Sequence, residues 1–296
     1  MPRLEEKHVS KYESRSVNGR SLITSGESRN ASCSGQSVRP NINIPIDLNY
    51  LGSNPELIPN TKTVILVHGH GATAANSTLN PHVKNAILTN EDVNVIVVDW
   101  TVYSRLPYSR ADRHVAEVAM NIHSFLESQF LLLDPRLFHL VGFNLGAHIV
   151  GQTGRLYQGL VPRITALDPS KTNYMLSRTD AVYVEVIHTS GGTPVSIGLG
   201  IVLGDLDFFP NGGRKQPGCM NSTCNHDRAW WYFAGSQTPG TFMARCCSSQ
   251  SQMNSINCII NGEIRMGGND LAPKHGCPSG ILLIETCRSY PFYFGY

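Results

Sequence analysis

Three polar residues lie at positions from which they could transfer protons together. Asn144 is the middle residue of the turn GFNLG, and Asp168 ends the apolar run ITALD. His226 lies in CNHDRAWWYF, before a predicted helix. A carboxylate that orients a histidine allows the imidazole to take a proton from a third group and to return it to a leaving group. Taken singly, Asp168 also fits a turn-forming Asp-Pro, and His226 fits a surface histidine. Their combination, in this order, favours a shared site.

The turn at residues 142–146 follows one predicted strand and precedes a predicted helix. A strand, a five-residue turn with glycine at both ends and a helix resemble the nucleophile elbow of α/β-hydrolases, written G-x-S-x-G. Glycine is expected at both ends because strand and helix come too close for a Cβ atom, while the central residue adopts an unfavourable backbone conformation. In that fold the nucleophile precedes the acid and the histidine in the chain, as Asn144 precedes Asp168 and His226.

An oxyanion hole requires two backbone N–H groups directed at the charge that develops on a carbonyl oxygen. We expect one from Leu145, directly after the nucleophile position, and the other from His70, in the loop after an early strand. The pair His68 and His70 could suggest a metal, but neither has a carboxylate cluster nearby in the sequence. We predict neither a metal nor a cofactor.

The elements that would position these residues follow from the hydrophobic pattern. Residues 115–126 are apolar at helical spacing, and residues 145–157 predict a second helix directly after the turn. Short apolar runs are typical of strands buried on both faces of a parallel sheet. Alternating strands and helices predict an α/β fold with a mostly parallel sheet and a single domain. The predicted strands are TVILV, NVIVVDW, LFHLVGF, RITALDP and AVYVEVIHT.

Composition excludes several classes of protein. The 296 residues are 41% hydrophobic and 16% charged, with a formal net charge of +2. Such a chain can bury a large core. Its net charge is too small to indicate nucleic acid as a partner. No apolar run approaches the length of a transmembrane helix. Residues 1–40 are rich in serine and charge, and we predict a flexible polar tail followed by one domain over residues 41–296.

The chain has eight cysteines, seven of them in its last third, without the paired spacing of a zinc site. This pattern predicts disulfides and an oxidising, extracellular compartment. Glycosylation sequons at Asn30, Asn76 and Asn221 agree with secretion. Residues 1–12 have no apolar segment typical of a signal peptide, so we expect a mature form with an added methionine.

Several motifs together resemble the secreted neutral lipases, the family that contains pancreatic lipase and insect phospholipases of the A1 type. The resemblance is strong over residues 61–235 and weaker beyond, and it implies an α/β-hydrolase fold in which Asp168 and His226 belong to a triad. It also implies a disulfide between Cys247 and Cys258 and a loop closed by Cys219 and Cys224. The matching stretches are VILVHGHG, NVIVVDW, HLVGFNLGAHIVGQTGR, ITALDPS, DAVYVEVIHT, LGDLDFFPNGGRKQPGC and CNHDRAWWYF.

The chain departs from this family at the residue that performs the chemistry. The family motif GHSLGAH reads GFNLGAH here, so Asn144 replaces the nucleophilic serine. A carboxamide has no ionisable hydroxyl, so His226 cannot activate it to form an acyl-enzyme. In lipases of this family a long disulfide-bounded loop forms a lid over the groove, but here only four residues lie between Cys219 and Cys224. The segment SKTNYMLSRTDA is also shorter than its counterpart in the family. Both shortenings resemble the phospholipase-type branch.

Three functions are compatible with these observations. The first is a catalytically inactive lipase homologue, secreted as a yolk, storage or carrier protein, with a lipid or steroid-conjugate ligand and partner subunits; it resembles insect yolk proteins. The second is a triacylglycerol lipase or phospholipase A1 in which Asn144 is an engineered or allelic loss of the nucleophile. The third is an interaction protein without a storage role. We favour the first, because Asn144 preserves the elbow conformation while removing the nucleophile.

Overall fold

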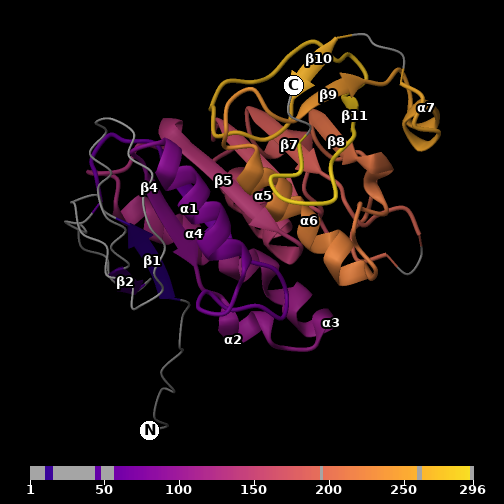
Figure 1. Ribbon diagram of the computed structural model, residues 1–296. Helices are drawn as coiled ribbons and strands as arrows, with labels where there is room; N and C mark the ends of the chain where they lie inside the picture. Colours follow the sequence, from indigo (N-terminus) through magenta and orange to yellow (C-terminus); the bar gives the residue numbers. More distant parts are fainter. Residues whose placement is uncertain (1–10, 16–43, 48–56, 194–195, 259–261, 294–296) are drawn as a thin grey trace, which may run out of the picture.

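One sheet of 11 strands forms the centre of the molecule (Figure 1). The computed structural model describes residues 11–15, 44–47, 57–193, 196–258 and 262–293. The strands are β1 Lys11–Arg15, β2 Ile44–Asp47, β3 Thr63–Val67, β4 Asn94–Val98, β5 Phe138–Phe143, β6 Arg163–Leu167, β7 Tyr183–Ile187, β8 Leu206–Pro210, β9 Met243–Cys246, β10 Glu263–Arg265 and β11 Ile281–Ile284. The α-helices are α1 Leu79–Asn90, α2 Thr101–Ser104, α3 Tyr108–Ala111, α4 Val115–Ser128, α5 Leu145–Leu156, α6 Ser222–Gly235 and α7 Gln250–Asn254.

The sheet is parallel in its centre and antiparallel at both edges. Its strand order is β10-β9-β11-β8-β7-β6-β5-β3-β4-β1-β2. All neighbouring strands in the central stretch β11-β8-β7-β6-β5-β3-β4 pair in parallel. The five predicted strands are β3 to β7, and every residue of β3, β4, β6 and β7 is buried. The predicted α/β-hydrolase fold with a mostly parallel sheet is confirmed.

The predicted N-terminal tail lies mostly outside the described residues. Within it the structure describes only β1, which pairs antiparallel with β4 and with β2. Residues 11–15 therefore form part of the sheet, where the composition predicted a flexible segment. The rest of residues 1–40, including Cys33 and the sequon at Asn30, is not among the described residues.

Alternate residues of the strands face two different helical layers. On one face Ile65, Leu140 and Ile164 share a buried cluster with α4 and α5. On the other face Val64, Val141 and Leu167 share a cluster with α1 and α6. Because neighbouring side chains of a strand point to opposite faces, continuous apolar runs are what this arrangement requires. Among the described residues, no helix has the length and apolar character that crossing a bilayer requires.

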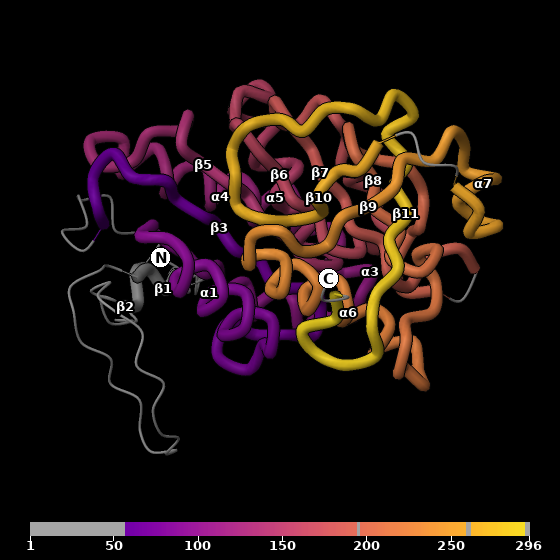
Figure 2. Tube along the Cα trace, turned by 45° about the horizontal axis from the view of Figure 1, so that its top comes forward, coloured from indigo at the N-terminus to yellow at the C-terminus, as the bar shows by residue number. Residues whose placement is uncertain are grey.

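Three disulfides strengthen the C-terminal part of the domain. Cys219 pairs with Cys224 and Cys247 with Cys258, as the family resemblance implied, and Cys246 pairs with Cys277. Cys287 forms no disulfide within the described part of the chain. The last described residues, at the yellow end of the tube in Figure 2, return to α6, where the ring of Phe292 packs against Tyr232.

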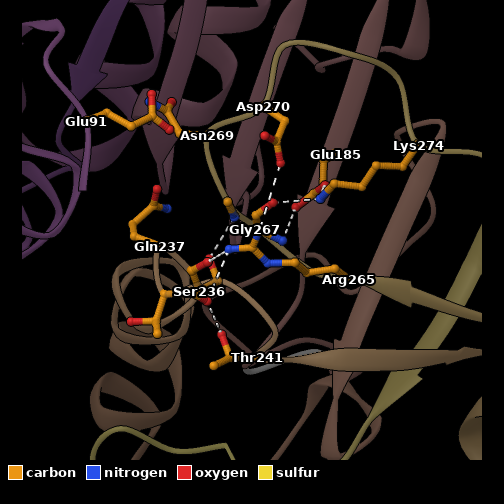
Figure 3. A network of polar contacts seen from close by, with 12 residues as sticks. Glu91, Glu185, Ser236, Gln237, Thr241, Arg265, Gly267, Asn269, Asp270 and Lys274 are labelled. Atoms are coloured by element: carbon orange, nitrogen blue, oxygen red, sulfur yellow. Dashed lines mark hydrogen bonds and ion pairs between the residues drawn. The ribbon is translucent and has the colours of Figure 1, made fainter.

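A buried polar network lies near the amino ends of β5, β6 and β7. Glu185 on β7 is fully buried and accepts hydrogen bonds from Arg163 on β6, at 3.0 Å, and from Lys274, at 2.6 Å. Figure 3 shows Lys274 reaching Glu185 from the segment between β10 and β11. The network therefore attaches this C-terminal segment to the central strands, away from the carboxyl ends where the candidate site lies.

Candidate active site

Asn144 occupies the sharp turn between β5 and α5. Its backbone angles are φ 58° and ψ −118°, which lie outside the regions that most residues adopt. A Cβ atom at Gly142 would lie 2.2 Å from the carbonyl oxygen of Gly146, and one at Gly146 would lie 2.4 Å from the carbonyl oxygen of Val67. Both glycines are therefore required by the close approach of β3, β5 and α5. The local geometry is that of a nucleophile elbow, with an asparagine at its centre.

The three residues singled out from the sequence lie together. The Nδ2 atom of Asn144 lies 2.9 Å from Nε2 of His226, and Nδ1 of His226 lies 2.5 Å from Oδ2 of Asp168. All three side chains are buried. An amide nitrogen can only donate, so the Nε2 atom of His226 is an acceptor and its Nδ1–H donates to Asp168. The arrangement is a chain of hydrogen bonds that runs from the elbow to the acid.

The placement of His226 differs from the prediction. We expected His226 to precede a helix, but α6 begins at Ser222 and includes it. The Asn221 side chain caps the helix by accepting a hydrogen bond from the backbone N–H of Cys224 at 2.8 Å. The Cys219–Cys224 disulfide closes the turn before this point. The shortened loop therefore starts the helix early enough to carry His226 to the elbow.

Asp168 is held as an anion by groups that sequence reasoning missed. Its Oδ1 atom accepts hydrogen bonds from the backbone N–H groups of Thr189, at 2.8 Å, and Ser190, at 3.2 Å, and its Oδ2 atom accepts one from the Ser190 hydroxyl. Burial acts to raise the pKa of Asp168, but His226, Ser190 and Thr189 outweigh it, so the net pKa is lowered. One signal could have found them, because Thr189 ends the predicted strand AVYVEVIHT and Ser190 directly follows it, at the same sheet edge.

The expected oxyanion-hole donor is already occupied by the elbow residue. The backbone N–H of His70 donates to Oδ1 of Asn144 at 3.2 Å. The His70 ring is used elsewhere, since its Nε2 atom lies 2.8 Å from the carbonyl oxygen of Leu106. Leu145, the other expected donor, is the first residue of α5, and N–H groups in a first helical turn have no acceptor within the helix. The carboxamide of Asn144 thus spans the distance from the His70 N–H to His226.

A pocket of about 460 Å³ opens beside Asn144 and His226. Its walls combine aromatic and aliphatic side chains, among them Tyr108, Phe143, Ile197 and Trp230. Asp227 also lines it, and burial raises the pKa of this carboxyl group. Within the described residues, no group of three or more His, Cys, Asp or Glu side chains is arranged to hold a metal ion. The pocket therefore presents an apolar wall together with polar side chains, which also include Ser77 and Thr223.

A sequence profile described as Lipase matches residues 53–275 of this chain. The chain belongs to the lipase family. This lipase-family chain is 34% identical over 234 residues to "Pancreatic lipase-related protein 2" of Cavia porcellus, covering 74% of itself and 51% of that protein. It is 33% identical over 253 residues to "Pancreatic triacylglycerol lipase" of Homo sapiens, with the same two coverages of 74% and 51%.

The lipase-family chain thus spans about half the length of the curated relatives it matches. Among solved structures, a lipase-esterase related protein from Clostridium acetobutylicum aligns with 38% of the chain and 45% of its own length, at a TM-score of 0.28 and 19% identity. That likeness is too low to bear on function. Three disulfides and the likeness to pancreatic lipases are consistent with an extracellular protein.

The elbow glycines offer a first test of this geometry. We expect Gly142→Ala to lower the free energy of unfolding by about 1–3 kcal/mol or more, because backbone atoms, which cannot move aside, would contact the added methyl group. Gly235→Ala is the matched control, since its Cβ would lie 3.1 Å from its nearest neighbours, a contact that a small shift relieves, so we expect a smaller loss of stability. Urea unfolding followed by circular dichroism measures both. Equal stability of Gly142→Ala and the unmodified protein would contradict the close packing of β5 against α5.

Proposed function

We propose that this lipase-family protein does not hydrolyse esters and that it binds lipid in the pocket beside Asn144, as a secreted storage or carrier protein. One observation carries the first part of the proposal. The carboxamide of Asn144 is hydrogen-bonded to the His70 N–H at one end and to His226 at the other. It therefore occupies both positions that an attacking serine and a polarised substrate carbonyl need, and it provides no nucleophile.

The pocket supports lipid as the ligand class. Its volume of about 460 Å³ lies in the range of sites that enclose small organic molecules. The apolar side chains in its wall suit an acyl chain or a steroid skeleton, the polar ones suit a head group or a conjugate, and the lipase relationship points to the same class of compound. Asn144 is already hydrogen-bonded to the His70 N–H and to His226, so an apolar ligand beside it does not break these contacts.

A storage role extends this proposal beyond the pocket. The resemblance to insect yolk proteins, which share the fold and lack the nucleophile, suggests a secreted glycoprotein that is deposited in egg yolk, with partner subunits. Two of the three sequon asparagines, Asn76 and Asn221, are exposed, so glycans could be attached there without disturbing the core. Asn76 lines the pocket, and so does Thr223, which belongs to the sequon that begins at Asn221. Glycans on Asn76 and Asn221 would therefore lie at the rim of the pocket.

Activity and ligand binding can be measured on the same preparation. We expect no turnover of short-chain esters or phospholipid by the unmodified protein, and saturable binding of a fluorescent monoacyl lipid. Ile197→Trp narrows the pocket and should weaken binding by about tenfold to a hundredfold, the equivalent of the usual 1–3 kcal/mol cost of overpacking. Ile201→Trp adds the same side chain to an exposed position of the same loop and should leave binding unchanged.

Each part of the proposal can fail separately. Turnover that scales with protein concentration and is abolished by His226→Ala would overturn the loss of esterase activity. Binding that is unaffected by Ile197→Trp would show that lipid does not occupy the pocket beside Asn144. Detection of the protein in egg yolk by a specific antibody tests the storage role, and its absence from secreted fluids and eggs would rule that role out.

A further inference from the structure

The Asn144 side chain is held in the way that this type of site holds an acyl group. In acyl transfer, the carbonyl oxygen lies against an oxyanion-hole N–H while the leaving atom lies beside the histidine. Here Oδ1 of Asn144 accepts the His70 N–H at 3.2 Å, and its Nδ2 atom lies 2.9 Å from Nε2 of His226. The carbonyl is thus polarised at one end, and its amide nitrogen faces a proton carrier at the other.

We propose that Asn144 is itself the substrate of this site and that the chain hydrolyses its own carboxamide to an aspartate, with release of ammonia. The reaction needs one co-reactant, water. The pocket of about 460 Å³ reaches both Asn144 and His226, so a water molecule can approach Cγ of Asn144 from the open side. The proposal is compatible with the loss of esterase activity, because neither Asn144 nor an aspartate in its place is a serine nucleophile. It applies to the pocket without a bound ligand, which water can enter.

The bond changes can be followed atom by atom. Water attacks Cγ of Asn144, a C–O bond forms, and His226 takes the proton that the water loses. The His70 N–H stabilises the negative charge on Oδ1, and Asp168, 2.5 Å from Nδ1 of His226, stabilises the imidazolium. His226 then passes the proton to Nδ2, and the C–N bond breaks. Ammonia leaves and takes the proton of the new carboxyl group, giving ammonium and a carboxylate.

Mass spectrometry of the protein in ¹⁸O-labelled water tests this reaction. Freshly prepared protein is incubated near neutral pH, digested, and the peptides containing Asn144 and Asn225 are compared over time. Asn225 is the internal reference, because it is half-buried and more exposed than Asn144, and its Oδ1 accepts the Gln216 backbone N–H at 2.7 Å. We expect conversion at Asn144, with one ¹⁸O per new carboxylate, and little at Asn225. Conversion at Asn225 as fast as at Asn144 would overturn the proposal.

A variant separates chemistry by His226 from passive deamidation. His226→Gln retains a polar side chain in the site but cannot carry the proton, and we expect conversion at Asn144 to slow by about 100-fold, the lower end of general acid–base contributions. An unchanged rate in a folded variant would overturn the role of His226. Isoaspartate at residue 144 would overturn the attack by water, because it arises from cyclisation by the Leu145 nitrogen. The comparison with Asn225 does not depend on the variant folding.

Discussion

Asn144→Ser is expected to raise the rate of ester hydrolysis by about 10⁴-fold or more, since removal of the serine from an intact triad enzyme costs on the order of 10⁶ in kcat. The reason is that the other parts are in place. His226 lies within hydrogen-bonding distance of the residue 144 side chain, and it is oriented by Asp168 at 2.5 Å. Replacing the carboxamide also frees the His70 N–H for a substrate oxygen. Initial rates on short-chain esters and phospholipid measure the gain.

Two controls give this experiment its meaning. Asn144→Ala removes the carboxamide and frees His70 and His226 without adding a nucleophile, so it should remain inactive. Asn144→Ser combined with His226→Ala should also be inactive, because the hydroxyl then has no base. A fluorophosphonate probe should label only the Asn144→Ser protein, through the new serine. A folded Asn144→Ser protein without turnover or labelling would mean that the pocket no longer admits an ester.

The parts of the site that could be predicted from the sequence are those encoded by local motifs. Asn144 and Asp168 directly follow two recognisable strands, β5 and β6, whose parallel pairing brings their ends to one edge, whereas His226 lies inside α6, which begins earlier than the sequence predicted. The hydrogen bond from the His70 N–H to the Asn144 carboxamide was not predictable. It joins residues 74 positions apart and depends on a side-chain rotamer that no local pattern determines.

The same distinction holds for the fold. The strands β3 to β7 are buried β-branched runs, which predict central parallel strands directly. The hydrophobic pattern did not predict β8 and β11, which pair with each other in parallel. Their short apolar runs lie among glycines, prolines and cysteines, where a strand cannot be distinguished from a buried loop. Edge strands such as β10, with only three residues, carry almost no periodicity to detect.

The largest stability effect is expected from Arg163→Met. Arg163 is fully buried and donates to Glu185 at 3.0 Å and to the carbonyl oxygens of Asp270, at 2.7 Å, and Gly267, at 3.0 Å. Removing one partner of a buried ion pair typically costs about 3–5 kcal/mol. Lys274 still neutralises Glu185 in this variant, so we expect a cost near the lower end of that range, to which the two carbonyl oxygens left without a donor contribute. Arg136→Met is the matched control, since its pair with Asp134 is exposed and should contribute nothing measurable. Urea unfolding at neutral pH measures both variants.

The pH dependence of this cost shows whether charge or packing is responsible. Burial acts to raise the pKa of Glu185, but Lys274 and Arg163 outweigh it, so the net pKa is lowered. A carboxyl group whose pKa is lower in the folded state stabilises the fold at neutral pH, and this contribution is lost as the pH falls below about 4. Once Glu185 is protonated, Arg163 has no carboxylate to neutralise, so the cost of Arg163→Met should shrink in acid.

The competing explanation is that Arg163 matters for its volume and for the two carbonyl oxygens it satisfies. A cost of that origin would persist unchanged through the titration of Glu185. Glu185→Gln distinguishes the two readings further, because it removes the charge and keeps the shape. If charge decides, Arg163→Met should cost less in the Glu185→Gln background than in the unmodified protein, and the difference is the coupling between the two residues. Equal costs in both backgrounds would show that the contribution of Arg163 does not depend on the Glu185 carboxylate.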